Sequence, residues 1–341
     1  SLPTLDYPTL AVVPEPDVAT YTVQGALVAL DPYVESARWG YDESELDAYY
    51  DHALEAGMLP LRDARYGWPR ATTIWGLAYN QDWLQALGYE APPETWETFG
   101  EMACQVVRRP YSKAVGDAAS TGYVFPVEGD VFLQGLVTRG GDVISESLDS
   151  YLFNGPAGAE TVNFLRDLAR RGCARPAQAL EDPVDGFGTG RALFAVIDLA
   201  QWNAYNQAVR AGARFDWGIA PLPHSTAEPQ SPVNHTTYVL FDSQPEAQLA
   251  AWYFVKWLEA PEQQAWWIAE TGALPTRQQA TGWIPEYVAR YPYYAQALDV
   301  IETGEYVTLP QVAGYAACHD LLTPMLAESL NTTRFQTILD T

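Results

Sequence analysis

Short apolar runs alternate with amphipathic segments along this chain from its first residues. Residues 9–13 form an apolar run that is typical of a buried strand, and a helix is predicted from Pro16 to about Gly25. Residues 77–80 end another apolar run, and a short helix is predicted over 82–87. Strands that alternate with helices in this way predict an α/β fold.

Several helix boundaries are marked by particular residue types. Gly88 can adopt the left-handed conformation that closes a helix, and the two prolines at 92–93 cannot continue one. Thr95 is a suitable N-cap for the helix that follows. Ser243 and Glu246 have the spacing of a capping box, so we expect Ser243 to cap a later helix.

The second half of the chain continues the alternation. We expect helices over 130–138, 156–171, 243–258 and 261–271, strands over 215–223 and 237–241, a glycine turn and a strand within 187–196, a polar link over 224–232, and a mostly helical tail from 284. No internal repeat interrupts this order.

The composition is that of a globular protein. The 341 residues suffice for one large domain or two ordinary ones, and 48% of them are apolar while 18% are charged. No apolar run is long enough to span a membrane, and no signal-peptide pattern is present. We therefore expect any signal peptide or lipid anchor to lie outside this sequence.

The charge restricts the partners. The net charge is −24, from 43 acidic and 19 basic residues, and such a field repels nucleic acid. A free anionic ligand would need a local cluster of Arg or Lys, which the sequence does not show. The balance predicts no nucleic-acid partner and favours a neutral carbohydrate or polyol as ligand.

No cofactor, metal or nucleophile motif stands out. The glycines at 188–190 and 140–141 are too sparse for a dinucleotide or phosphate loop, and the four histidines lack metal-ligand spacing. No G-x-S-x-G sequence occurs. Acidic pairs such as Glu128 and Asp130 do not indicate a glycosidase, because the diagnostic is a separation in space. We predict no cofactor, no metal and no catalytic residue.

The aromatic residues carry a more specific signal. The chain has 12 Trp and 21 Tyr, and rings of these types stack on the apolar faces of sugars. Trp75, Tyr123, Trp202 and Trp267 follow or flank predicted strand and helix ends. Arg277 is the best polar candidate, because its fork of donors can hold a carboxylate, a phosphate or vicinal hydroxyls.

Ordered motifs across the chain resemble family 1 of the extracellular solute-binding proteins. The first is the segment 66–99, in which an aromatic-Asn pair ends a strand and Pro-Pro-x-Thr-Trp opens the next helix. It is followed in order by Gly-Gly-Asp at 140–142, Phe-x-x-Gly-Arg-Ala at 187–192, Lys-Trp-Leu-x-x-Pro-Glu at 256–262 and Gly-x-x-Pro-x-Arg at 272–277. Members of that family are the receptor subunits of ABC importers for sugars and glycerol-phosphate.

The resemblance implies a type II periplasmic-binding-protein-like fold, in which two α/β lobes are joined by hinge strands and close on a ligand. We expect lobe 1 to comprise 1–76 and 236–283, and lobe 2 to comprise 77–235 and 284–341. The implied protein is a non-enzymatic receptor in the periplasm or at the cell surface. It would deliver a carbohydrate or polyol from the interlobe cleft to the ABC permease subunits, with tethering by an N-terminal lipid outside this sequence.

The resemblance also implies ligand contacts on the crossovers. Thr72, Thr73 and Trp75 lie on the first crossover, where the family contacts ligand, and His235 lies on the second. Arg277 falls on a turn where glycerol-phosphate-type members use an arginine. The expected ligand-binding residues are Thr72, Thr73, Trp75, Tyr123, Asp130, Trp202, His235, Trp267 and Arg277.

Two departures from the family pattern keep alternatives open. Members usually begin with a strand, a helix and a second strand before the unit that opens this chain, so we expect the N-terminal βαβα part of lobe 1 to be lacking. The second crossover has His-Thr-Thr-Tyr at 235–238 in place of an aromatic-Gly-x-Ser run. A scaffold or assembly subunit without ligand, or a glycoside-processing enzyme, remains an alternative.

The three cysteines allow one disulfide. Cys104 and Cys173 both fall in the inferred second lobe, and export would place them in an oxidising compartment. We predict a Cys104–Cys173 disulfide with Cys318 as the free thiol. The alternative is three unpaired buried thiols.

Overall fold

A computed structural model describes residues 8–116, 119–177 and 182–331. The chain forms two compact units. The first consists of Ser1–Thr73, Val233–Arg290 and Thr308–Ala317, and the second of Ile74–Pro232, Tyr291–Val307 and Cys318–Thr341. The chain therefore passes between the units within three residues of two of the three crossing points expected from the sequence, those at 76 and 235.

The C-terminal part differs from the expected division. Residues 284–290 and 308–317 belong to the first unit, whereas the sequence predicted a second-lobe tail from 284 onward. Where the chain returns at 308, the Thr308 hydroxyl donates a hydrogen bond to the Glu55 carboxylate of the first unit at 2.6 Å. Mostly helical structure in this tail was expected, and the helices α13 (Pro285–Arg290), α14 (Pro292–Thr303) and α15 (Tyr315–Asn331) supply it.

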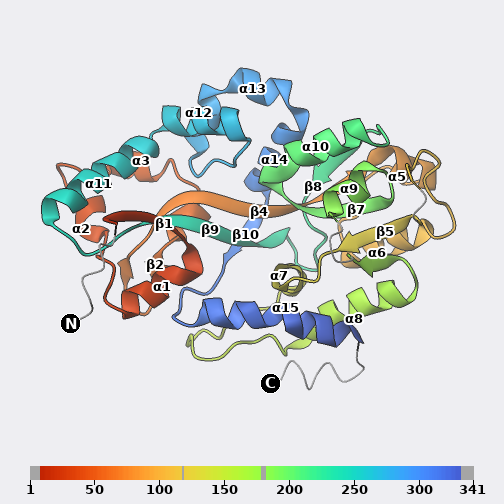
Figure 1. The fold of residues 1–341 in the computed structure, drawn as a ribbon, viewed down its shortest axis with the longest axis horizontal. Coiled ribbons are helices and arrows are strands. Elements are labelled where there is room, and N and C mark those ends of the chain that lie inside the picture. Colours follow the sequence, from red (N-terminus) through yellow and green to blue (C-terminus); the bar gives the residue numbers. More distant parts are fainter. Residues whose placement is uncertain (1–7, 117–118, 178–181, 332–341) are drawn as a thin grey trace. The chain divides into compact units, whose positions relative to one another are not determined.

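The first unit contains short helices, a sheet and a helical pair (Figure 1). Its elements are β1 Leu10–Pro14, α1 Glu15–Val23, α2 Asp31–Val34, α3 Glu43–Leu46, α4 Asp51–Glu55, β2 Met58–Leu59, β3 Ala64–Arg65, the start of β4 Trp68–Asn80, most of β9 Gln230–Leu240, α11 Pro245–Leu258, α12 Pro261–Thr271, the 3-10 helix η2 Gln278–Trp283, α13 Pro285–Arg290 and the first turn of α15 Tyr315–Asn331.

An aromatic cluster forms the core of this unit. β1 pairs antiparallel with β9, with Leu10 opposite Leu240. Trp68, which is fully buried, stacks on Tyr41 with ring centroids 4.8 Å apart and meets Trp252 edge-on. Its indole N–H donates to the Tyr49 hydroxyl, so the ring is both packed and hydrogen-bonded.

The start of α11 corrects one prediction. The N-cap is Gln244 and not Ser243, and no side chain caps this helix. Pro245 occupies the first helical turn, where its fixed φ and missing N–H fit best, and this places the cap one residue later than the capping-box spacing suggested. The Ser243 hydroxyl donates to the Thr9 hydroxyl instead.

The second unit is built around a mixed sheet. Its elements are the end of β4, α5 Gln81–Leu87, α6 Trp96–Gln105, β5 Thr121–Phe125, α7 Gly129–Val137, α8 Pro156–Arg170, β6 Ala174–Pro176, α9 Pro183–Gly188, β7 Ala192–Asp198, the 3-10 helix η1 Leu199–Gln201, α10 Trp202–Ala211, β8 Trp217–Ala220, the start of β9, α14 Pro292–Thr303, β10 Glu305–Thr308 and the rest of α15.

The strand order of this unit decides which loops meet. β5 lies between β6 and β7 and is parallel to both, whereas β4 is antiparallel to β7 and β8. The carboxyl ends of β5, β6 and β7 therefore share one edge of the sheet. In α/β sheets this edge is where ligands bind.

The helix ends that open this unit follow the local sequence signals. Asn80 caps α5 by accepting a hydrogen bond from the Trp83 N–H at 2.9 Å, and Gly88 ends the helix with φ of 97°. Thr95 caps α6 through a reciprocal arrangement with Thr98. The strand end, short helix and second helix read from the sequence are all present.

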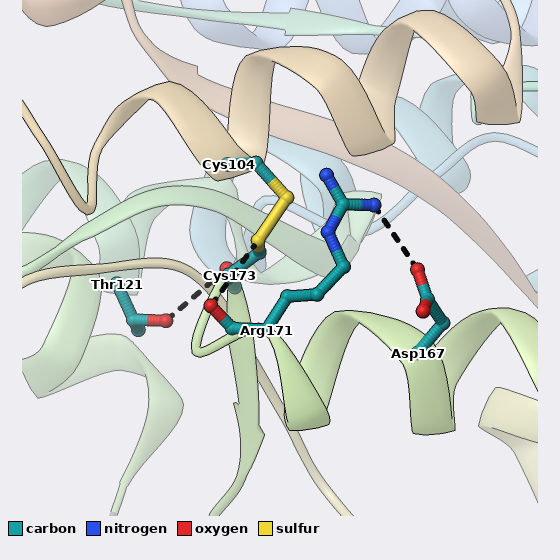
Figure 2. Close-up of a disulfide and its surroundings, with 5 residues drawn as sticks. All are labelled: Cys104, Thr121, Asp167, Arg171 and Cys173. Atoms are coloured by element: carbon teal, nitrogen blue, oxygen red, sulfur yellow. Dashed lines mark hydrogen bonds and ion pairs between the residues drawn. A yellow bond between two sulfur atoms is a disulfide. The ribbon is translucent and has the colours of Figure 1, made fainter.

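A disulfide joins α6 to the segment after α8. Cys104 and Cys173 are bonded with their Cα atoms 4.4 Å apart, which is the pairing expected from the sequence (Figure 2). The Cys173 carbonyl accepts a hydrogen bond from the Thr121 hydroxyl at the start of β5, and Arg171 pairs with Asp167. Cys318 is a free thiol. Across the described residues, no helix is long and apolar enough to cross a membrane.

Candidate functional site

A pocket of about 490 Å³ opens at the carboxyl-end edge of the second unit's sheet. Its walls come from the loop after β5, the segment after β6, the end of β7 and the start of α10. β4 runs antiparallel to β7, so its residue Trp75 lies opposite Asp198 and reaches the same edge. The volume falls within the range of roughly 300–1,000 Å³ that is usual for small-molecule sites.

Three aromatic side chains line this pocket. Trp75 is half-buried, whereas Tyr123 and Tyr205 are almost fully buried. Burial raises the pKa of Tyr205, and the nearby charges of Asp182 and Asp198 raise it further. Tyr205 therefore keeps its proton and can donate a hydrogen bond.

Two carboxylates stand at helix starts beside Tyr205. The Asp198 carboxylate accepts a hydrogen bond from the Ala200 N–H at 3.0 Å, and the Asp182 carboxylate accepts one from the Val184 N–H at 2.9 Å. Burial raises the pKa of Asp198 to about 6, although the backbone hydrogen bond from Ala200 opposes this. Asp198 is therefore mostly ionised at neutral pH, where it can accept a hydrogen bond from a ligand hydroxyl, and protonated in mild acid.

Two further acids and an amide complete the polar lining. Glu128 and Asp130 lie at the start of α7, and the buried Gln134 lies one turn later. Asp130 lies 3.0 Å from His319 Nε2, and this hydrogen bond raises the pKa of His319. His319 therefore positions the Asp130 carboxylate.

The charge balance of the pocket is one-sided. Four carboxyl side chains line it, from Glu128, Asp130, Asp182 and Asp198, and no Lys or Arg is among the described lining residues. Carboxylates accept hydrogen bonds from hydroxyl or ammonium groups but repel phosphates and other anions. The arrangement can hold a polyhydroxylated or cationic ligand between aromatic walls.

The structure thus brings three of the expected ligand-binding residues, Trp75, Tyr123 and Asp130, into one pocket. Trp202 lies elsewhere: it is fully buried and packs on Tyr291 and Tyr294, with ring centroids 5.3 and 6.2 Å away. It therefore serves the core of the second unit.

The expected crossover residues on β4 lie in the first unit. Thr72 is buried, and its hydroxyl has no hydrogen-bond partner among the described residues. Thr73 is half-buried. Neither threonine lines the second-unit pocket or the first-unit cavity at Trp267, so a role for either in ligand binding stays a prediction.

His235 is built into a buried polar chain. Its Nδ1 lies 2.9 Å from the Glu15 carboxylate, and its Nε2 lies 3.2 Å from His52 Nδ1. Both rings are buried in the first unit, and burial lowers the pKa of His52 to about 3. These internal partners give His235 a structural role in the first unit.

Arg277 is buried, and two of its three guanidinium nitrogens donate to backbone carbonyls of the first unit, whereas Nε has no hydrogen-bond partner among the described residues. The guanidinium donates to the Glu259 carbonyl at 3.0 Å and to the Glu45 carbonyl at 2.8 Å, and it stacks over Tyr49 at 4.5 Å. A ligand anion would have to replace these contacts. Arg277 does not line the second-unit pocket.

Trp267 lines a different and smaller cavity, within the first unit. It lies on α12, and its ring is 40% exposed.

Sequence reasoning missed part of the pocket: Asp182, Asp198, Tyr205 and Gln134. Asp198 had the clearest signal, because it lies two residues after the strand expected within 187–196, and strand ends are where ligands bind in α/β sheets. Tyr205 had none, because its place depends on how α10 packs. Within the part of the chain that the structure describes, no cluster of His, Cys, Asp and Glu could hold a metal ion.

Comparison with known proteins shows the family to which the chain belongs. The sequence profile of the bacterial extracellular solute-binding proteins matches residues 1–294. The chain belongs to this family. Its members are extracellular solute receptors and not enzymes, as the ordered motifs predicted.

The curated relatives of this solute-binding protein are distant. The sn-glycerol-3-phosphate-binding periplasmic protein UgpB of Escherichia coli (strain K12) is 22% identical over 294 residues, which are 80% of this chain and 62% of the relative. UgpB of Pectobacterium atrosepticum is 22% identical over 280 residues, 79% of this chain and 60% of the relative. The chain thus spans about 60% of the length of these relatives.

Solved structures share the fold of this solute-binding protein. The cyclic alpha-maltosyl-1,6-maltose binding protein of Arthrobacter globiformis matches with a TM-score of 0.77 at 20% identity, over 98% of this chain and 82% of that one. A solute-binding protein of Agrobacterium radiobacter K84 in complex with ribitol matches with a TM-score of 0.77 at 20% identity, over 99% and 83%. The periplasmic-binding-protein fold expected from the sequence is confirmed.

Proposed function

We propose that this solute-binding protein is the extracytoplasmic receptor of an ABC importer and that it binds a neutral carbohydrate or polyol. The pocket of the second unit would supply part of the binding surface. The observation that carries the proposal is the combination of Trp75, Tyr123 and Tyr205 with carboxylates in one pocket of about 490 Å³.

The chemistry of the lining supports this ligand class. A sugar or polyol presents C–H faces that pack on aromatic rings and hydroxyls that donate to carboxylates. Asp198, Asp130 and Gln134 supply the acceptors, and Tyr205 supplies a donor. Structural neighbours of this chain include one in complex with ribitol and one that is a cyclic alpha-maltosyl-1,6-maltose binding protein.

A phosphorylated ligand fits this pocket less well. The curated relatives are sn-glycerol-3-phosphate-binding proteins, but phosphate recognition relies on Arg or Lys donors. The described lining of the second-unit pocket has none and has four carboxyl groups. We therefore place phosphorylated polyols below neutral ones.

A small organic cation is the second candidate. Four carboxyl groups without a basic neighbour in the lining would attract a polyamine or a quaternary ammonium group, and Trp75 would offer a ring face for it. Neutral and cationic ligands are separated by experiment, because only the cation should bind more weakly as salt rises.

A thermal-shift screen tests the proposal. The probes are maltose, ribitol, sn-glycerol-3-phosphate and spermidine, each against the full chain. A ligand at a hundredfold excess over Kd stabilises the folded state by about 2.7 kcal/mol. We expect stabilisation by maltose or ribitol, with no effect of sn-glycerol-3-phosphate.

Variants locate the binding. Tyr205→Phe keeps the buried ring and removes only the hydroxyl, so it should reduce the shift without unfolding the protein. Trp283→Ala is the matched control, because Trp283 is an exposed tryptophan that lines neither pocket. A shift with spermidine alone would favour the cationic ligand. The absence of any shift would favour the scaffold role and overturn the proposal.

A further inference from the structure

Three exposed tryptophans surround a small cavity in the first unit. The cavity has a volume of about 80 Å³ and lies where α11 and α12 pack against each other. Trp257, Trp266 and Trp267 line it and are 54%, 61% and 40% exposed. Tryptophan side chains are usually largely buried, so three neighbouring rings in solvent indicate a surface that contacts something else.

The inner wall of this cavity is polar. Glu259, Gln264 and Thr276 are all buried and line it. The Gln264 amide N–H donates to the Glu259 carboxylate and to the Thr276 hydroxyl, and that hydroxyl in turn donates to Glu259 at 3.3 Å. The other amide atom, Gln264 Oε1, is buried and accepts no hydrogen bond from the described residues. A buried acceptor of this kind needs an explanation, and a ligand donor would supply one.

The charges in the cavity balance each other. Arg70 lines the cavity with its guanidinium 4.6 Å from the Trp267 ring centroid. Burial raises the pKa of Glu259 to about 7, while hydrogen bonds from Gln264, Thr276 and Tyr238 and the charge of Arg70 oppose this. With one cation and one carboxyl group in its walls, the cavity has no excess charge to attract a strongly charged ligand.

We propose that this cavity is a second site, which binds the end of a neutral polyhydroxylated molecule such as a saccharide. A terminal hydroxyl or hydroxymethyl group would donate to Gln264 Oε1 and to Glu259, and the adjoining C–H groups would pack on Trp266 and Trp267. The cavity has room for more than a single water molecule, because its 80 Å³ is several times the roughly 10–15 Å³ that one water needs on the same measure. The rest of the molecule would pack on the exposed rings of the three tryptophans.

The second site and the second-unit pocket have no lining residue in common. Binding at one can therefore be tested independently of binding at the other. A phosphate or nucleic-acid ligand is disfavoured by the single arginine and the buried carboxyl group. Self-association through the exposed tryptophans is the competing explanation, and the experiment is chosen to reveal it.

The test is fluorine NMR of the full chain labelled with 5-fluorotryptophan and titrated with maltose. Single Trp→Phe variants assign the signals of Trp257, Trp266, Trp267 and Trp75. We expect the signals of Trp266 and Trp267 to shift saturably with maltose. At about pH 8, where Glu259 is mostly ionised, Glu259→Gln keeps the shape of the side chain and should weaken this response about tenfold, because a hydrogen bond to a charged group is lost.

Controls separate the two sites. Trp283→Ala and Asp198→Asn should leave the response of Trp266 and Trp267 unchanged, because neither residue lines the cavity. If only Trp75 responds to maltose, the second site is refuted and the proposed function stands. If the signals of Trp257, Trp266 and Trp267 instead broaden with protein concentration and ignore maltose, the surface is an interface between copies, and the second site is likewise refuted.

Discussion

Replacing Asp198 by Asn should make the folded protein more stable at neutral pH. The Asp198 carboxyl lies in a largely buried position at the end of β7, and burial raises its pKa from 3.8 to about 6. A carboxyl group whose folded pKa is raised stabilises the folded state only while it is protonated. That contribution is complete below the unfolded pKa and is lost as the pH rises through about 6.

The magnitude follows from the two pKa values. The interval from 3.8 to about 6 corresponds to about 3 kcal/mol, because each pKa unit is worth about 1.4 kcal/mol. Asn has no charge to desolvate, and its side-chain oxygen can still accept the hydrogen bond from the Ala200 N–H. Asp198→Asn should therefore raise the free energy of unfolding by up to about 3 kcal/mol at neutral pH.

Urea unfolding at about pH 4 and about pH 8 measures this effect. The gain should be present at the higher pH and should shrink toward zero at the lower one. Asp149→Asn is the control with opposite sign, because hydroxyl hydrogen bonds from Ser147 and Ser145 lower the pKa of this exposed carboxylate. The reasoning is refuted if Asp198→Asn is no more stable than the wild type at about pH 8, or if its gain is the same at both pH values.

Three further predictions concern the scaffold, each measured by urea unfolding. Replacing Cys104 and Cys173 together by Ser should lower stability by about 4 kcal/mol, because the disulfide closes a loop of 69 residues, whereas Cys318→Ser should have little effect; equal losses would contradict this. Gly88→Ala should cost about 1–2 kcal/mol from the left-handed φ of 97° alone, since no atom lies within 4 Å of the added Cβ; no cost would show that α5 ends differently. Trp68→Ala should cost about 3–5 kcal/mol, because Trp68 is fully buried in the first unit's core, and a smaller loss would mean that the aromatic cluster repacks.

Local signals explain what the sequence predicted correctly. Gly88 and Thr95 mark helix ends through backbone conformation and side-chain hydrogen bonds that involve only near neighbours, so their roles are readable without the fold. Ser243 shows the limit of such signals. The capping-box spacing is present, but the helix begins at Pro245, which is favoured in the first helical turn, and Gln244 is the N-cap.

The pocket could be predicted only in part, because it depends on strand register. Trp75 and Tyr123 were expected to contact ligand, and both line the second-unit pocket. Asp198 joins them only because β4 and β7 pair with Trp75 opposite Asp198, a register that no local pattern reveals. Trp202 was also expected to contact ligand, but it is buried in the core of the second unit. The sequence could not separate the two cases, because a tryptophan that packs in the core and one that binds a sugar have the same sequence signal.

The central claim is that the second-unit pocket binds a neutral polyhydroxylated solute, and a calorimetric titration tests it most directly. Ribitol and maltose are titrated into the wild type, Asp198→Asn and the surface control Asp149→Asn. We predict saturable binding to the wild type and to Asp149→Asn, with affinity reduced by about tenfold or more in Asp198→Asn, because a charged hydrogen-bond acceptor is lost. Binding of equal strength in all three proteins, or no binding of either ribitol or maltose to the wild type, would contradict the claim.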